Sequence, residues 1–141
     1  MHVDASGTLW IATSAGVDQY AEGRLRSETL LRYVPHALAS EREESLWVGF
    51  ATEGFVRLGR GQFRSYTTAD GLRSSYVAAT IEDRHGSIWL ATAEGLHRFY
   101  DGNITAFPIA EGELSNRVTS LAVDREGYVW AGTEAGVFRF D

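Results

Sequence analysis

Residues 83–99 read DRHGSIWLATAEGLHRF, and this pattern decides the fold because it occurs four times in a chain of 141 residues. The other copies are DASGTLWIATSAGVDQY at 4–20, EREESLWVGFATEGFVRL at 41–58 and DREGYVWAGTEAGVFRF at 124–140. Each copy has an apolar residue before a tryptophan and a glycine six or seven residues after it. The tryptophans are 37, 42 and 41 residues apart. Self-similarity at such a period indicates a repeat architecture.

Four short strands are predicted within one repeat, from β-branched and apolar runs separated by turn residues. In the third repeat they are residues 76–83, 87–92, 95–100 and 103–107. The first two are joined by Asp-Arg-His-Gly at 83–86, and Asp-Arg-Glu-Gly at 124–127 repeats this turn. A turn-initiating aspartate and a glycine that can adopt positive φ are typical of hairpins. The strands of one repeat are therefore expected to be antiparallel neighbours.

The strand around Trp89 is apolar on both of its faces. Ile88 and Leu90 point to one side, and Trp89 and Ala91 point to the other. A sheet with one solvated face would alternate apolar with polar residues, so both faces of this sheet are expected to be covered by other parts of the protein. A β-sandwich covers one face of each sheet, whereas a β-propeller packs each four-stranded blade between two others. We therefore predict an all-β fold, a partial β-propeller.

The predicted propeller segment covers residues 1–141 and has about four four-stranded antiparallel blades, of which the first and last are incomplete. The blades are expected at approximately 1–34, 35–75, 76–115 and 116–141. Nothing before Val3 matches residues 117–122, and nothing after Asp141 matches residues 103–107. Exposed terminal blades favour association. We expect one of two ways of covering these blades. Either the chain self-associates, as a head-to-tail dimer or larger ring, or the remainder of a longer propeller chain completes the ring.

Composition excludes several classes of function. The net charge of −6 and a pI near 5.2 argue against nucleic acid as a partner. There is no cysteine, which excludes disulfides and every cysteine-based metal site. No apolar run is long enough to cross a bilayer, so direct membrane insertion is not expected, and the first residues lack the pattern of a signal peptide.

Taken together, the repeats resemble the two-component regulator propeller family. Its pattern is an acidic turn with glycine, then Leu-Trp-x-Gly-Thr, then x-x-Gly-Leu-x-Arg, which residues 83–99 and 124–140 match best. DGLRSSYV at 70–77 and EGELSNRV at 111–118 are similar to the connector of the family. The second repeat departs from the pattern because its acidic turn, residues 41–44, has no glycine. The resemblance implies a periplasmic or otherwise extracytoplasmic sensor for signal transduction.

The four tryptophans could form a carbohydrate-stacking surface, but tryptophan between apolar neighbours on a central strand is expected to pack between blades. The aspartates of the acidic turns offer too few oxygens for calcium and fit Asx-turns. The histidines lack the spacing of a zinc site. No nucleophile elbow or phosphate loop is present. We therefore expect no enzyme, no cofactor and no metal, and a propeller lyase is disfavoured.

The loops that enter each blade, and those between its second and third strands, are predicted to emerge at one face of the ring. Loops on a rigid scaffold are where binding groups concentrate, although solvated loop residues of the same types are common. The candidate ligand-binding residues on these loops are Arg73, Ser75, Tyr76, Glu94, Asn116, Arg117 and Glu134.

Two classes of function remain open. The first is a ligand-sensing β-propeller segment, for which the resemblance implies an oligosaccharide or other small molecule as the signal. The second is a non-catalytic protein-interaction scaffold that assembles into a closed ring.

Overall fold

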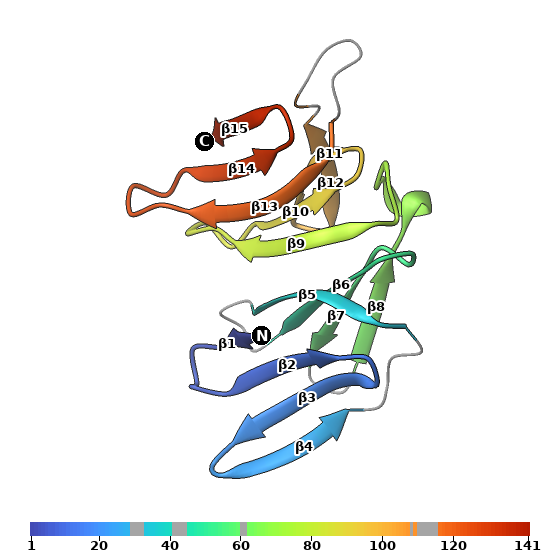
Figure 1. Cartoon of the computed structure of the whole chain (residues 1–141), viewed down its shortest axis with the longest axis vertical. Coiled ribbons are helices and arrows are strands. Elements are labelled where there is room, and N and C mark those ends of the chain that lie inside the picture. The colour runs from blue at the N-terminus through green and yellow to red at the C-terminus, as the bar shows by residue number, and fades with distance from the viewer. Residues whose placement is uncertain (29–32, 41–44, 60–61, 108, 110–115) are drawn as a thin grey trace.

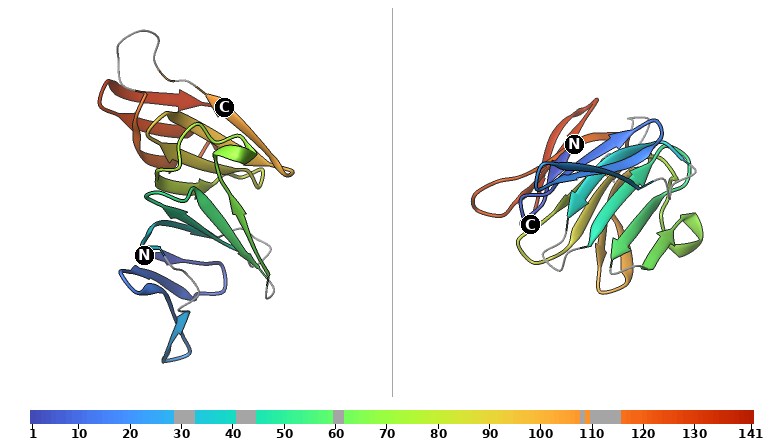
Figure 2. Two further views of the ribbon diagram at one scale, coloured as in Figure 1. Left: turned by 90° about the vertical axis from the view of Figure 1, so that its right-hand side faces the viewer. Right: turned by 90° about the horizontal axis from the view of Figure 1, so that it is seen from below.

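The computed structural model describes residues 1–28, 33–40, 45–59, 62–107, 109 and 116–141. Within them the chain forms three four-stranded sheets and one three-stranded sheet, all antiparallel and each made of consecutive strands. Figures 1 and 2 show the sheets following one another in chain order along the long axis of the molecule. The described residues include no helix long and apolar enough to cross a membrane. The predicted all-β blade architecture is confirmed.

We number the sheets as blades 1 to 4. Blade 1 contains β1 (His2–Val3), β2 (Leu9–Thr13), β3 (Gly16–Ala21) and β4 (Arg24–Glu28). Blade 2 contains β5 (Pro35–Ser40), β6 (Leu46–Phe50), β7 (Phe55–Gly59) and β8 (Gln62–Tyr66), and is followed by a 3-10 helix, η1 (Thr68–Asp70). Blade 3 contains β9 (Val77–Glu82), β10 (Ile88–Thr92), β11 (Gly95–Tyr100) and β12 (Asn103–Phe107). Blade 4 contains β13 (Val118–Val123), β14 (Val129–Thr133) and β15 (Gly136–Phe140).

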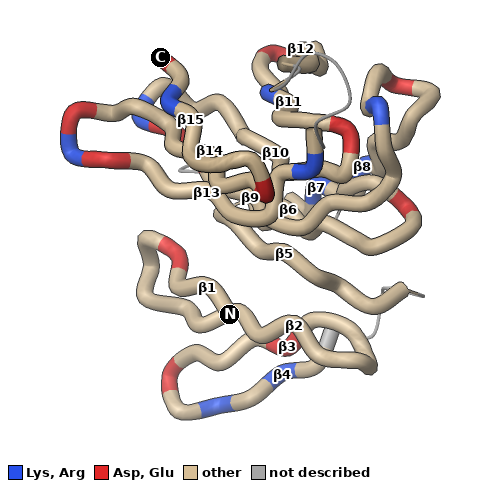
Figure 3. The backbone as a smooth tube through the Cα atoms, turned by 45° about the horizontal axis from the view of Figure 1, so that its top comes forward, with Lys and Arg blue, Asp and Glu red and all other residues tan. Residues whose placement is uncertain are grey.

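The first and last blades are incomplete, as the sequence predicts. The first strand of blade 1 has two residues, and blade 4 has three strands. The first strands of successive blades lie next to one another, because β5 contacts β1 and β9, and β9 contacts β13. They therefore form the inner side of the propeller. Most of the described Asp and Glu residues lie outside the strands, many of them in turns (Figure 3), and β5, β6 and β10 contain no Asp, Glu or Arg.

The hydrophobic core lies between the blades. Trp47 of blade 2 is 1% exposed and packs with Ile88 and Leu90 of blade 3. Trp89 is also 1% exposed and packs with Val129 of blade 4. All five residues of β10 are buried, so this strand is covered on both faces as predicted.

The other two tryptophans are less covered than the sequence predicts. Trp10 is half-buried against the cluster between blades 1 and 2. Trp130 is 37% exposed, so the expectation that all four tryptophans are core residues is wrong for this one. The physical reason is position: each tryptophan faces the blade that follows, and the side chain of Trp130 points away from blade 3.

The arginine of the repeat lies opposite the tryptophan across the central pair of strands. Trp47 pairs with Arg57, Trp89 with Arg98 and Trp130 with Arg139. The guanidinium carbons lie 5.5, 5.7 and 5.9 Å from the respective indole centroids. Cation–π contact between cross-strand neighbours explains why the motif combines these two residue types. Blade 1 has Gln19 at this position.

Candidate functional site

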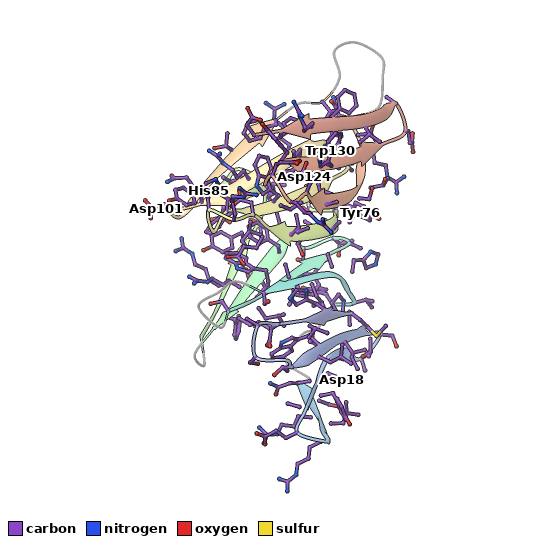
Figure 4. The ribbon with its side chains drawn as sticks, turned by 90° about the vertical axis from the view of Figure 1, so that its left-hand side faces the viewer. Asp18, Tyr76, His85, Asp101, Asp124 and Trp130 are labelled. Atoms are coloured by element: carbon purple, nitrogen blue, oxygen red, sulfur yellow. The ribbon has the colours of Figure 1, made fainter. Side chains whose placement is uncertain are left out.

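The strand registers bring the predicted loops to one edge of the blades. Val77, at the start of β9, pairs with Thr92, which pairs with Gly95 after the β10–β11 turn. Blade 4 repeats this geometry, because Val118 pairs with Thr133. Residues 72–76, 93–94, 116–117 and 134–135 therefore lie at corresponding ends of their blades, which we call the connector edge. The acidic turns lie at the opposite, hairpin edge (Figure 4).

The connector between blades 2 and 3 is an ordered structure rather than an open loop. Thr67 caps η1: its Oγ1 accepts from the Ala69 N–H at 3.2 Å, and its own N–H donates to Asp70 Oδ2 at 2.8 Å. This reciprocal capping box satisfies backbone donors at the start of the helix. Leu72 is buried in the core between blades 2 and 3. The connector is thus fixed at its beginning by a cap and by an apolar anchor.

Two further hydrogen bonds hold the segment that carries the predicted residues. The Gly54 N–H donates to the Ser75 carbonyl at 2.8 Å, which ties the connector to blade 2. The Arg73 N–H donates to His97 Nε2 at 3.1 Å, which ties it to blade 3. Arg73 is exposed, and Ser75 and Tyr76 are half-buried. The backbone that carries these three side chains is therefore positioned from both neighbouring blades.

His97 is a residue whose role the sequence does not reveal. It is completely buried, and this burial lowers its pKa. A backbone hydrogen bond at Gly95 raises the pKa of His97, and the charge of Arg73 lowers it, so the net shift is downward. A neutral imidazole can accept at Nε2 while its Nδ1 faces Thr92 Oγ1 at 3.4 Å. Asp18, Val56 and Phe138 occupy the equivalent positions in the other repeats. Repeat comparison therefore gives no signal for it.

Tyr76 is the centre of a cluster that spans three blades. The Arg117 guanidinium carbon lies 5.6 Å from the centroid of the Tyr76 ring. The exposed His36 contacts the same tyrosine edge-on, with ring centroids 6.0 Å apart. These residues stand at or just before the first strands β5, β9 and β13. We call His36, Tyr76 and Arg117 the Tyr76 cluster, and His36 is a member that the sequence analysis missed.

The remaining predicted residues are placed differently. Asn116 is structural in part, because its Oδ1 accepts from the Ile109 N–H at 2.9 Å across the connector between blades 3 and 4. Glu94 and Glu134 are exposed on the turns of their own blades. The structure therefore brings together Tyr76 and Arg117 from the predicted set.

The acidic turns at the hairpin edge serve the fold. Asp83 Oδ1 accepts from the His85 and Ser87 N–H groups at 2.8 and 2.9 Å, and Oδ2 accepts from Trp89 Nε1 at 2.8 Å. Burial raises the pKa of Asp83, but these hydrogen bonds outweigh it and the net shift is downward. Asp4 and Asp124 hold Trp10 and Trp130 in the same way, at 2.8 and 2.6 Å. The described residues contain no cluster of three or more His, Asp or Glu suited to a metal.

Comparison with known proteins supports the propeller fold and the repeat. Residues 112–135 match the family model described as the two component regulator propeller, so the chain carries the repeat that its motifs indicate. No curated protein matches the chain.

Solved structures give the same architecture. The extracellular domain of BT4673 from B. thetaiotaomicron, described once as a one component system and once as a hybrid two component system, superposes with TM-scores of 0.81 and 0.80 at 24% identity. The match covers 94% of this chain and 19% of that one, so this chain spans about a fifth of its length. Virginiamycin B lyase from Staphylococcus aureus superposes with a TM-score of 0.78 at 16% identity, over 99% of this chain and 54% of the lyase. Propellers of regulators and of an enzyme thus share this fold.

Proposed function

We propose that this chain is a segment of an extracytoplasmic sensor propeller of a two-component regulator, and that it binds a small polar ligand at the connector edge. The Tyr76 cluster is the observation that carries the proposal. It collects a phenol, a guanidinium and an imidazole from three blades, and capping and inter-blade hydrogen bonds hold the connector that carries the phenol. The repeat at residues 112–135 and the similarity to the BT4673 extracellular domain support the sensor role.

The chemistry of the cluster suits an oligosaccharide. A guanidinium offers several directed N–H donors, and a phenol and an imidazole can both donate and accept, so hydroxyl groups can be bound in either sense. Aromatic rings also provide apolar surface for the C–H face of a sugar. Because the three side chains come from different blades, a ligand that contacts all of them bridges blades 2, 3 and 4. Binding would then change how firmly these blades are held together, which is what a sensor requires.

The test is a binding screen with a matched set of variants. Maltotriose, cellotriose, xylotriose and trigalacturonic acid are titrated into the chain by calorimetry. We expect one to bind, and Tyr76→Ala and Arg117→Ala each to weaken its affinity about tenfold or more, the loss of roughly one good polar or stacking contact. Phe63→Ala, which removes an exposed aromatic side chain from β8 of blade 2, is the control and should have no effect. Undiminished affinity in both cluster variants, or no binding by any sugar, contradicts the proposal.

A second candidate, a protein-interaction scaffold, is favoured by the outward face of blade 4. Trp130 is 37% exposed and Val137 is 68% exposed, whereas the equivalent Trp89 and Leu96 of blade 3 are buried against blade 4. Blade 1 presents Tyr20 and Leu25, which are 45% and 61% exposed, on its own outward face. We propose that the face of blade 4 packs against a blade of the same kind, which a second copy can supply head to tail.

Light scattering tests this second candidate. The chain has a mass of 15.6 kDa, and we expect a particle of twice that mass or more at micromolar concentration. Trp130→Arg should shift the particle toward the single-chain mass, because it places a charge in the proposed contact. A stable single chain in the absence of the substitution contradicts the candidate. So does an assembly that Trp130→Arg leaves unchanged.

A further inference from the structure

The buried imidazole of His97 has a hydrogen-bond partner at each nitrogen. Thr92 Oγ1 donates its proton to the Gly95 carbonyl at 2.8 Å, so toward Nδ1, 3.4 Å away, the hydroxyl can only accept. Nδ1 therefore carries the ring proton. Nε2 is left unprotonated and accepts from the Arg73 N–H at 3.1 Å. All of these donors and acceptors match when the imidazole is neutral.

Protonation of His97 would turn the acceptor of this bond into a donor. An imidazolium carries an N–H at both nitrogens, so Nε2–H would face the Arg73 N–H. The hydrogen bond is then lost, and two opposed donors in a buried place are unfavourable. β11 pairs with β10 and β12 on its two sides and holds the ring. Arg73, on the connector, is therefore the partner that moves.

The bond to His97 holds the segment directly before Tyr76. The Gly54 N–H ties the Ser75 carbonyl to blade 2 at 2.8 Å, and the imidazole ties the Arg73 N–H to blade 3. Tyr76 follows this segment immediately in the chain. Loss of the His97 bond would therefore release one of the two sides from which the backbone before Tyr76 is positioned.

The surroundings of His97 favour its neutral form. Burial lowers its pKa, and among the described residues Arg73 is the charged group that acts on it, also downward. β10 and β12, which flank its strand, contain no Asp, Glu, Arg or His, and Arg98 of β11 lies over the Trp89 ring on the opposite face. The other ionisable side chains on nearby elements are Arg57 and Tyr66 of blade 2, Asp70 of the connector, Glu94 of the β10–β11 turn, and His36, Tyr76 and Arg117 of the Tyr76 cluster.

We infer that His97 is a positioning residue that makes the connector sensitive to pH. Protonation at Nε2 breaks the bond from the Arg73 N–H, and residues 73–76 open away from blade 3. The Tyr76 cluster is then assembled while His97 is neutral and loosened in acid. The effect on a ligand rests on the proposed function, whereas the opening of the connector does not.

The direction of the pH effect follows from the two pKa values of His97. In the open connector it has the ordinary histidine pKa of about 6.5, and in the closed connector its pKa is lower. The open form therefore binds a proton first, and it gains about tenfold in population one pH unit below that value. We expect the protection factor of the Arg73 amide against hydrogen exchange to be about tenfold lower at about pH 5.5 than at about pH 7.5. The turn aspartates, whose pKa values are lowered from 3.8, stay ionised throughout.

Matched variants of the whole chain identify the titrating group. His97→Gln supplies a neutral acceptor from its side-chain carbonyl, so the protection of the Arg73 amide should no longer depend on pH. His85→Gln removes an exposed imidazole from the other edge of blade 3 and should keep the full fall in protection (Figure 4). A fall that persists in His97→Gln overturns the proposal. So does a fall that disappears in His85→Gln, or in His36→Gln, which would place the titration in the cluster itself.

Two measurements on the unsubstituted chain do not depend on how well a variant folds. The His97 ring signal should titrate by NMR below the ordinary pKa of about 6.5, and titration at or above that value contradicts the inference. Protection of the Arg73 amide should also stay below that of β6, whose five residues are buried, because the opening is local. Equal protection at both pH values would mean that the connector opens only when the protein unfolds, and would overturn it. Neither measurement uses a ligand, so the sugar screen for the Tyr76 cluster can fail without changing this outcome.

Discussion

Replacing Trp89 with alanine is expected to lower the free energy of unfolding by about 3–5 kcal/mol, the range for a large aromatic removed from a tight core. The side chain is 1% exposed between blades 3 and 4. Its ring lies 5.5 Å from Phe107 and 6.2 Å from Phe140, centroid to centroid, so truncation opens a cavity lined by aromatic groups. It also removes the Nε1 donor of the buried Asp83 carboxylate. Denaturant melts measure the loss.

Trp130→Ala is the matched control for this prediction. Trp130 occupies the same place in its repeat and donates to Asp124 just as Trp89 donates to Asp83. However, it is 37% exposed in the single chain, so its removal leaves no closed cavity in melts at concentrations where chains do not associate. We expect a loss below about 2 kcal/mol, mainly from the hydrogen bond and partial burial. Similar losses for the two variants would show that blade packing is not what stabilises the Trp89 position.

The blade could be predicted from the sequence because its determinants are local and repeated. The Asp-to-Gly turn before Trp89 closes a hairpin by itself, and Gly86 adopts the positive φ of 80° that the turn requires. The apolar run around Trp89 indicates burial on both faces, whichever blades supply the cover. Trp130 lies in the same motif and is nevertheless 37% exposed, because burial also depends on the neighbouring blade.

The candidate sites could be predicted only in part, because they combine residues that are distant in sequence. Tyr76 and Arg117 were predicted from loop position, but His36 belongs to the start of another blade and has no motif. The role of His97 was not predicted, because its burial and the hydrogen bond that it accepts from the Arg73 N–H belong to one repeat and not to the motif.

Gly54→Ala is expected to lower the free energy of unfolding by more than about 3 kcal/mol, through a positive-φ penalty and a steric clash. The φ of Gly54 is 75°, and an added Cβ would collide with the Tyr66 carbonyl oxygen and approach Leu72. Gly54 also accepts from the Phe50 N–H and donates to the Ser75 carbonyl. The clash therefore acts on the contact that holds the connector to blade 2.

Gly23→Ala separates the two causes. Gly23 has the same φ of 75°, but nothing lies within 4 Å of its added Cβ, so only the backbone penalty of about 1–2 kcal/mol remains. Hydrogen exchange in residues 72–77 gives a second measurement, because Gly54→Ala should accelerate it and Gly23→Ala should not. If both variants lose the same stability, the close packing at Gly54 does not hold the connector. Unchanged exchange in Gly54→Ala would mean that the Tyr76 cluster keeps its position without the bond to Ser75.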